Sequence, residues 1–297
     1  MLPELREGGG PADLEILFEA LPERLAGARS CGEEVDVGES EVLMRLEDMR
    51  FRVSDGTRIA IDAPPGKAGI DIRIWLLGTV MAALLHQRGF LPLHANLVEL
   101  ERGGAAAFVG DSGAGKSTLA GWFEQHGHRV LGDDLCAVRF DDAGRPLVYP
   151  GIPRLKLWKE SLTLLGRSPL GLERVASDLD KYHVPLARDD SADSLAPLAL
   201  RRVYVLSRVL GRAEHDGQPL IAPIAGGEAA AAVLANAFRW YLGQAIHHGA
   251  RSQFDQCVAV ARHAGLFMVH RTWGHDRFAA EAEAIEAHLA ANHDLPR

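Results

Sequence analysis

The sequence predicts an α/β fold built on a mixed sheet and preceded by a small β-rich N-terminal segment. Three observations predict it. Short apolar strands alternate with helical stretches, a glycine-rich loop at 110–117 joins one strand directly to a helix, and the first 65 residues contain short alternating runs. The 297 residues are 47% hydrophobic and 24% charged, which is typical of a globular chain with a large core.

Composition also excludes some classes of function. The formal net charge is −8, so nucleic acid is a poor candidate partner. The sequence has no stretch of about 18 consecutive apolar residues, so no membrane span is predicted. The N-terminus lacks the basic and apolar regions of a secretion signal. Three scattered cysteines, Cys31, Cys136 and Cys257, form no C-x-x-C pair. We therefore expect a cytoplasmic protein that binds neither membranes nor nucleic acid.

The N-terminal segment is expected to end near residue 65. Strands are predicted at 42–47, 51–54 and 58–62, and Ser54-Asp55-Gly56-Thr57 has the composition of a hairpin turn. Ala63-Pro64-Pro65-Gly66-Lys67 then breaks the pattern. This predicts a β-rich segment over 1–65, whose exposed edge could recruit an extended peptide, and a second, larger domain over 66–297.

The remaining elements follow from periodicity and turn residues. An amphipathic helix is expected at 71–88, and strand 93–100 turns at Gly103-Gly104 into strand 105–109. Residues 166–197 have an irregular composition, apart from a short apolar strand that begins at Lys181. Further strands are predicted at 128–131, 135–140, 146–149, 202–207 and 266–270, and helices at 116–125, 228–246, 252–264 and 275–291.

The glycine-rich loop fits the pattern G-x-x-x-x-G-K-[ST] and lies between an apolar strand and a helix, as a phosphate-binding loop must. Its backbone N–H groups and the helix N-terminus can bind the phosphates of a nucleoside triphosphate. Lys116 is expected to reach the β- and γ-phosphates, and the Ser117 hydroxyl to ligate Mg²⁺. The loop residues are Gly110, Asp111, Ser112, Gly113, Ala114, Gly115, Lys116 and Ser117, followed by Thr118.

Two acidic residues and one histidine are expected beside this loop. Asp133 and Asp134 follow Lys116 by 17 and 18 residues, across one helix and one strand. If strands 105–109 and 128–131 form a parallel pair, their carboxyl ends meet at one sheet edge and the aspartates lie near the phosphates. The two-glycine turn likewise places His94 opposite 110–112. An early aspartate suits a kinase, in which a base meets the acceptor hydroxyl beside the γ-phosphate.

These residues resemble the kinase domain of the HPr kinase/phosphorylase family. The resemblance rests on His94, on Gly-Asp-Ser-Gly-Ala-Gly-Lys-Ser at 110–117 and on His126-Gly127-His128-Arg129-Val130-Leu131-Gly132-Asp133-Asp134, and covers about residues 92–140. It implies that 66–297 is an ATP-binding catalytic domain with a P-loop fold like that of phosphoenolpyruvate carboxykinase and HPr kinase, and that the reaction is ATP-dependent phosphorylation of serine. It also implies that Asp133 is the general base, that His94 assists it, that Asp134 supports the metal or the acceptor, and that Ser117 helps to hold Mg²⁺.

The segments Pro153–Trp158 and Asp180–Leu186 resemble those of HPr-kinase-like relatives found beside ribosomal-peptide genes, including lasso-peptide clusters. The chain lacks the Glu-Ile-Arg-Gly-Leu-Gly run of the HPr kinases, which favours a one-way kinase acting on a peptide or small protein other than HPr. A small-molecule P-loop kinase, an HPr-like protein kinase and a non-catalytic ATP-binding regulator stay open as alternatives.

Three further cations are candidates for neutralising the triphosphate, because phosphoryl transfer depends on positioning and on charge stabilisation. They are Arg154, Lys156 and Lys181, of which Lys181 is preferred because it begins a short apolar strand. The choice of ATP over GTP, the acceptor and a possible homo-oligomeric state are not decided by the sequence.

Overall fold

The computed structural model describes residues 12–176, 178–187, 196–209, 220–247, 249–272 and 276–291. The chain divides into two units, one made of residues 1–92 and 238–254 and the other of residues 93–237 and 255–297. This division differs from the expected boundary at residue 65, since the helical segment after that residue belongs with the N-terminal strands. Strand β7 (Leu91–Leu93) and helix α7 (Ala250–His263) each contain a boundary.

The first unit is a six-stranded sheet with the strand order β1-β6-β5-β4-β3-β2. Neighbouring strands are antiparallel except for β1 and β6, which are parallel. The sequence predicted the last three of these strands and missed the first three. The strands are β1 (Glu15–Phe18), β2 (Arg29–Cys31), β3 (Val35–Val37), β4 (Glu41–Leu46), β5 (Met49–Ser54) and β6 (Arg58–Asp62).

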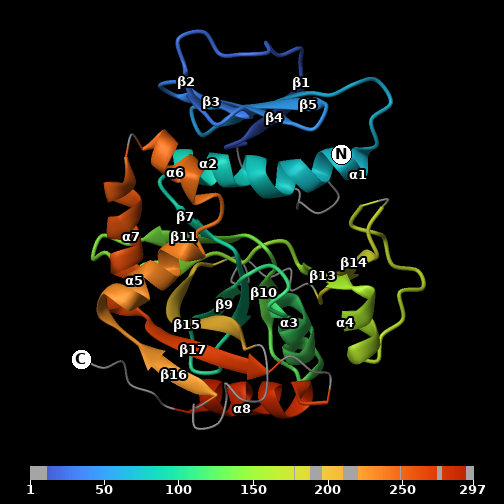
Figure 1. The fold of residues 1–297 in the computed structure, drawn as a ribbon, viewed down its shortest axis with the longest axis vertical. Helices are drawn as coiled ribbons and strands as arrows, with labels where there is room; N and C mark the ends of the chain where they lie inside the picture. Colours follow the sequence, from blue (N-terminus) through green and yellow to red (C-terminus); the bar gives the residue numbers. More distant parts are fainter. Residues whose placement is uncertain are drawn as a thin grey trace. The chain divides into compact units, whose positions relative to one another are not determined.

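A continuous helical segment, formed by α1 (Gly69–Trp75), one π-helical turn (Leu76–Val80) and α2 (Met81–Gln87), covers one face of this sheet (Figure 1). It is long and apolar enough to cross a membrane, but a core helix passes the same test and half of it is buried. Its apolar stripe packs on alternate strand residues, together with α6 (Trp240–Ile246). The buried residues of this core include Val42, Met44, Phe51, Val53, Ile59, Ile72, Leu76, Val80 and Leu242.

The second unit contains a mixed sheet in which β10-β8-β9-β15 are successive neighbours and β17 and β16 continue beyond β15. Strands β9, β15 and β17 are parallel, and the hairpin β8–β9 and the pairs β10–β8 and β16–β17 are antiparallel. The bounds are β8 (Ala95–Glu99), β9 (Ala105–Gly110), β10 (Val130–Gly132), β11 (Cys136–Phe140), β12 (Pro146–Val148), β15 (Leu198–Val209), β16 (Ile221–Ile224) and β17 (Gly265–Thr272).

The strand order corrects one expectation. Strands β9 and β10 do not pair with each other, because β8 lies between them and is antiparallel to both. The hairpin connection makes β8 run in the opposite direction to β9, so β10 still runs the same way as β9. Residues that follow β9 and β10 therefore lie at one edge of the sheet, with His94 preceding β8 at that same edge.

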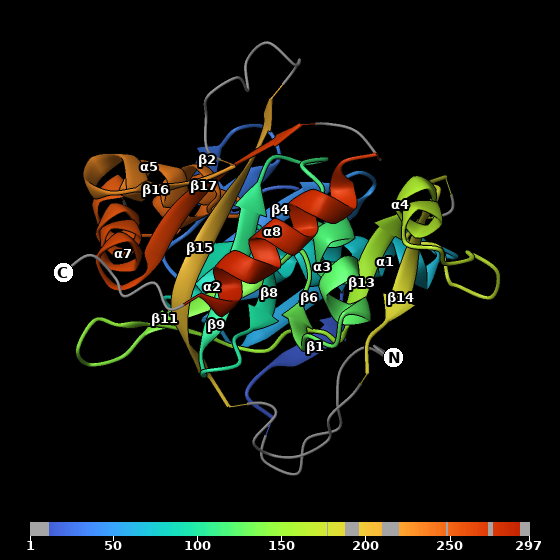
Figure 2. The same ribbon diagram turned by 90° about the horizontal axis from the view of Figure 1, so that it is seen from below.

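Helices α3 (Lys116–Gln125) and α8 (Phe278–Ala290) pack in one core with this sheet (Figure 2). Two elements missed by the sequence analysis belong to the same core: β13 (Arg154–Trp158) and α4 (Lys159–Leu164). Strand β13 pairs with β14 (Lys181–Pro185) in a separate two-stranded ribbon. The expected helix 228–246 is two helices, α5 (Gly226–Ala235) and α6, separated by a residue with left-handed backbone, Arg239.

Candidate active site

The glycine-rich loop at 110–117, which we expect to bind phosphate and call the phosphate loop, connects the end of β9 to the start of α3, as the sequence predicted. Gly110 adopts φ +142°, and a Cβ atom there would lie 2.6 Å from the carbonyl oxygen of Leu206 on the neighbouring strand β15. Only glycine fits this close approach of two backbones. The loop is therefore fixed to the central parallel strands, and α3 directs its N-terminus at the space above them.

Lys116 begins α3 and is 6% exposed. Its Nζ atom donates hydrogen bonds to the carbonyl oxygens of Gly110 at 2.7 Å and Asp111 at 3.1 Å. Burial lowers the pKa of Lys116, against the opposing charges of Asp134 and Asp133. A phosphate group close to this ammonium group would be strongly stabilised by its charge, which suits a triphosphate ligand.

Asp133 follows β10 and its carboxylate accepts three hydrogen bonds. The donors are the Ser117 hydroxyl at 3.0 Å, the Asn96 side-chain amide at 2.8 Å and the backbone N–H of Lys156 at 2.6 Å. Burial, followed by the neighbouring charge of Asp134, raises the pKa of the Asp133 carboxyl group. Asp133 is thus tied to the phosphate loop and to β13, and it does not line the pocket described below.

The side chain of Asp134 points in a different direction from that of Asp133, because the backbone of Asp134 is left-handed. It has φ +69°, a left-handed conformation that aspartate tolerates better than most side chains. Its Oδ2 atom lies 2.6 Å from Nζ of Lys156, and the side chain is 26% exposed. Burial alone would raise the pKa of Asp134, but Lys156 and Lys181 outweigh it and hold the pKa well below its usual range. Two adjacent carboxylates therefore occupy different environments, and only Asp134 faces the pocket.

His94 lies beside Asp134 rather than Asp133. Its Nε2 atom is 3.9 Å from Oδ1 of Asp134. The expected hairpin is present, with Ala95 opposite Val109, so His94 is held at the end of the sheet next to the loop. Burial, then the charge of Lys116, lowers the pKa of His94 to about 4. His94 is therefore neutral at pH 7 and acts on the site by polar contact and shape.

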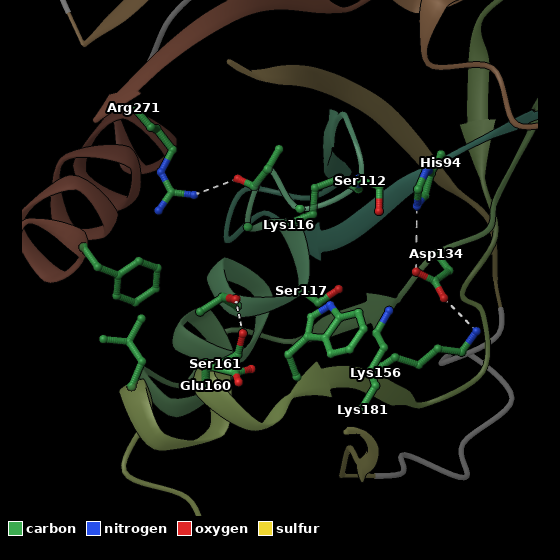
Figure 3. A pocket seen from close by; sticks show the side chains of 17 residues that line it. His94, Ser112, Lys116, Ser117, Asp134, Lys156, Glu160, Ser161, Lys181 and Arg271 are labelled. Atoms are coloured by element: carbon green, nitrogen blue, oxygen red, sulfur yellow. Dashed lines mark hydrogen bonds and ion pairs between the residues drawn. The ribbon is translucent and has the colours of Figure 1, made fainter. Parts of the chain in front are cut away.

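The loop, the acidic pair and the β13–β14 ribbon surround one pocket of about 470 Å³ within the second unit (Figure 3). Four cations and two carboxylates line it, an excess of positive charge that suits a polyanionic ligand. The lining residues are His94, Ser112, Gly113, Ala114, Gly115, Lys116, Ser117, Thr118, Asp134, Lys156, Trp158, Glu160, Ser161, Leu164, Lys181, Arg271 and Phe278.

The ribbon explains how two lysines reach this pocket. Along β13, Leu155 and Leu157 are buried in the core, so the intervening Lys156 lies on the opposite face. Lys181 begins β14 directly opposite Trp158, and its Nζ atom lies 5.7 Å from the centre of the indole ring. Lys181, preferred from the sequence, lines the pocket, and so does Lys156, whereas Arg154 does not.

Six lining residues were not singled out from the sequence. Trp158, Glu160, Ser161 and Leu164 lie on or just after β13, where the alternation in Arg-Leu-Lys-Leu-Trp was an available strand signal. Arg271 and Phe278 come from the end of β17 and the start of α8, more than 150 residues after the loop. No local pattern in the sequence connects these two residues to it.

The donor set beside the loop fits Mg²⁺. The Ser117 hydroxyl and the Asp133 carboxylate are neighbouring hard oxygen ligands of the type that this ion prefers. Among the described residues no group of three or more histidine, cysteine, aspartate or glutamate side chains forms a metal cage. A magnesium ion here would accordingly complete its coordination with phosphate oxygens and water, as is usual for this ion.

No protein-family model matches the chain, and no curated protein matches it by sequence. Among solved structures, it is similar to one described as "Structure of the Hpr(Ser) kinase/phosphatase from Coxiella burnetii". The TM-score is 0.33 and the sequence identity 10%, over 67% of this chain and 96% of that chain. A similarity this distant says nothing about chemistry, so the function is argued below from the residues of the pocket.

Proposed function

We propose that this protein is a kinase that uses ATP and Mg²⁺ to phosphorylate a serine hydroxyl of a peptide or small protein. One observation carries the proposal: a phosphate-binding loop shares its pocket with Asp134, while the adjacent Asp133 is bonded to Ser117 of the loop. Kinases need a carboxylate near the γ-phosphate to orient the acceptor hydroxyl, in addition to ligands for the metal. A serine acceptor and a peptide substrate follow from the family resemblance of residues 92–140.

The chemistry divides among the side chains as follows. Lys116 and the loop N–H groups bind the phosphates. Ser117 and Asp133 would hold the metal, which would neutralise phosphate charge. Asp134 accepts a hydrogen bond from the acceptor hydroxyl and takes its proton as the oxygen bonds to phosphorus and ADP leaves. Lys156 and Lys181 stabilise the charge on the transferring phosphoryl group.

This assignment exchanges the roles that the family resemblance implies for the two aspartates. The low pKa of Asp134 makes it a weak base. In a loose phosphoryl-transfer transition state, however, the hydroxyl proton is lost late, so a carboxylate contributes mainly by aligning the nucleophile. Asp133 accepts a hydrogen bond from Ser117, which places it beside the other expected metal ligand, and it does not line the pocket that an acceptor would enter.

The direct test is phosphoryl transfer itself. The purified protein is incubated with Mg²⁺-ATP and serine-containing candidates, beginning with ribosomally made precursor peptides such as lasso-peptide precursors, and products are analysed by intact mass. We expect addition of one phosphate to a serine, lost in Lys116→Ala and Asp134→Asn. ATP binding without transfer to any acceptor, peptide or small molecule, would support the ATP-binding regulator instead.

A further inference from the structure

The two ends of the nucleotide pocket differ in chemistry. His94, Asp134, Lys156 and Lys181 make one end polar and charged. In Figure 3, Arg271 lies on the other side of Lys116 from His94 and Asp134. Two other lining residues are apolar and pack in the hydrophobic core of the second unit. They are Phe278, at the start of α8, and Leu164, at the end of α4. A pocket with an apolar part and a charged part is the kind of site that a nucleotide requires.

Arg271 is held in place by three contacts. Its Nε atom donates to Glu281 on α8 at 3.2 Å, and both side chains are nearly buried, at 11% and 10% exposure. Its Nη1 atom donates to the carbonyl oxygen of Ala114 in the phosphate loop at 3.3 Å. Its guanidinium carbon lies 5.5 Å from the centre of the Phe278 ring.

The phosphate loop is shaped around this arginine. A Cβ atom on Gly115 would lie 2.9 Å from Nη1 of Arg271, and Gly115 has φ +85°. Glycine is therefore needed here for the backbone turn, and any other side chain would displace the guanidinium group from its present position. Arg271 is thus part of the wall against which the loop packs, although it is 155 residues away from Lys116 in the sequence.

One nitrogen of Arg271 remains available. Among the described residues, Nη2 has no hydrogen-bond acceptor, while Nε and Nη1 are both used. Arg271 lines the pocket, so the guanidinium group presents a donor to it in a fixed orientation. A preorganised, nearly buried guanidinium is a strong binding group for a phosphate oxygen.

We propose that Arg271, Phe278 and Leu164 form the nucleoside end of the site. Nη2 of Arg271 donates to the α-phosphate, and the apolar wall of Phe278 and Leu164 packs on the ribose and base. The orientation of the nucleotide in the pocket rests on the proposed function, because the γ-phosphate must lie at Asp134 for transfer. The triphosphate then extends along the loop toward Arg271. The acceptor serine enters from the end formed by Trp158, Lys181 and His94.

The test compares two ligands, Mg²⁺-ATP and Mg²⁺-tripolyphosphate, by calorimetric titration. The double variant Arg271→Ala/Glu281→Gln removes the cation together with the charge of the carboxylate that it contacts, and should lower the affinity for both ligands by about tenfold or more. Leu164→Ala should weaken ATP by about three- to tenfold and tripolyphosphate by less than about twofold, because only the nucleoside loses apolar contact.

Two matched controls separate binding from folding. Leu172, like Leu164, is partly buried against the same core but does not line the pocket. Arg202 also stabilises α8, by donating to the carbonyl oxygens of His288, Leu289 and Ala291 at its other end. Leu172→Ala and Arg202→Ala should leave both affinities within about twofold of the wild type.

Three results would overturn the proposal. They are unchanged ATP affinity in the double variant, an equal effect of Leu164→Ala on both ligands, and a loss of ATP affinity in Arg202→Ala as large as in the double variant. The titrations involve no transfer, so the outcome is separate from the kinase assay. A protein that binds ATP as described but phosphorylates nothing would refute the proposed function and not this assignment, whereas a wild type that binds no ATP would refute both.

Discussion

The Ser117 hydroxyl donates a hydrogen bond to Asp133 at 3.0 Å, which links the phosphate loop to the residue that follows strand β10. The interaction depends on the strand order, because β8 lies between β9 and β10 and supplies Asn96, a second donor to the same carboxylate. Asn96 is fully buried, so its amide fixes the carboxylate in one position. The adjacent Asp134, with its left-handed backbone, is thereby free to face the pocket.

Replacing Lys116 should separate nucleotide chemistry from folding. Within the described part of the chain its ammonium group donates only to loop carbonyl oxygens, and Lys116 lines the pocket, so Lys116→Ala should reduce phosphoryl transfer by about 10²-fold or more. The thermal unfolding midpoint should change little, and circular dichroism can follow it. Near-normal turnover in this variant would mean that the triphosphate binds elsewhere.

His94 should matter less than the carboxylate it approaches. It lies 3.9 Å from Asp134 and is neutral at pH 7, so it supports the position of Asp134 without supplying charge. His94→Ala should lower turnover by about tenfold at most, and His94→Asn, which keeps a polar group, by less. Steady-state assays with saturating ATP measure both variants. A loss as large as that of Asp134→Asn would instead give His94 a direct role in transfer.

How much of the site the sequence could predict depends on how far apart in the sequence the interacting residues lie. The phosphate loop and the aspartate pair were predictable because a strand, a turn and a helix place them within 25 residues of chain. Which of the two aspartates faces the pocket was not predictable, because it depends on the insertion of β8 and on the φ of Asp134. Arg271 reaches the loop only through the parallel pairing of β17 with β15, which no local pattern encodes.

The buried carboxylate of Asp36 in the first unit should make the free energy of unfolding depend on pH. Asp36 is 2% exposed and accepts hydrogen bonds from two nitrogens of Arg45, which lower its pKa to about 2 against the opposing effect of burial. Because the folded-state pKa lies below the unfolded value, the carboxylate stabilises the fold above about pH 4, by about 2 kcal/mol, and this is lost as the pH falls toward 2.

Asp36→Asn should accordingly lower the free energy of unfolding at pH 7, and the difference from the wild type should shrink between about pH 4 and pH 2. Urea denaturation at several pH values measures it. Asp48→Asn is the control, since the ion pair of Asp48 with Lys67 is exposed and should contribute far less. A difference that stayed constant across this pH range would show that the Asp36 charge is not what stabilises the unit.

The edge of the N-terminal sheet is the place where we expect an extended peptide to bind. Of the strands in the described ranges, β1 pairs only with β6. The N–H groups of Glu15 and Glu19 are used in that pairing, so alternation directs the N–H of Phe18 outward. Phe18 is 69% exposed. Phe18→Pro removes this donor without breaking the β1–β6 ladder, and should raise the KM for the peptide while leaving the KM for ATP unchanged.

Phe18→Ala provides the matched control, because it removes the exposed ring and keeps the N–H group. A peptide KM that rises in Phe18→Pro and not in Phe18→Ala supports strand addition at this edge. If both variants bind the peptide normally, the N-terminal sheet has only a structural role. Deleting residues 1–65 would be a poorer test, since it strips the α1–α2 helical segment of the sheet on which it packs.

The central claim is that Asp134 orients the acceptor hydroxyl and Asp133 helps to hold the metal. Paired kinetics of Asp133→Asn and Asp134→Asn test it most directly. Turnover is measured against both Mg²⁺ and ATP. Asp134→Asn should lower turnover by about 10²- to 10⁴-fold with little change in the Mg²⁺ or ATP concentration required, because it removes the group that orients the acceptor. Asp133→Asn should instead raise the Mg²⁺ requirement and recover part of its turnover at high Mg²⁺. Near-normal turnover in Asp134→Asn, together with an inactive Asp133→Asn that Mg²⁺ does not rescue, would contradict the account and make Asp133 the base.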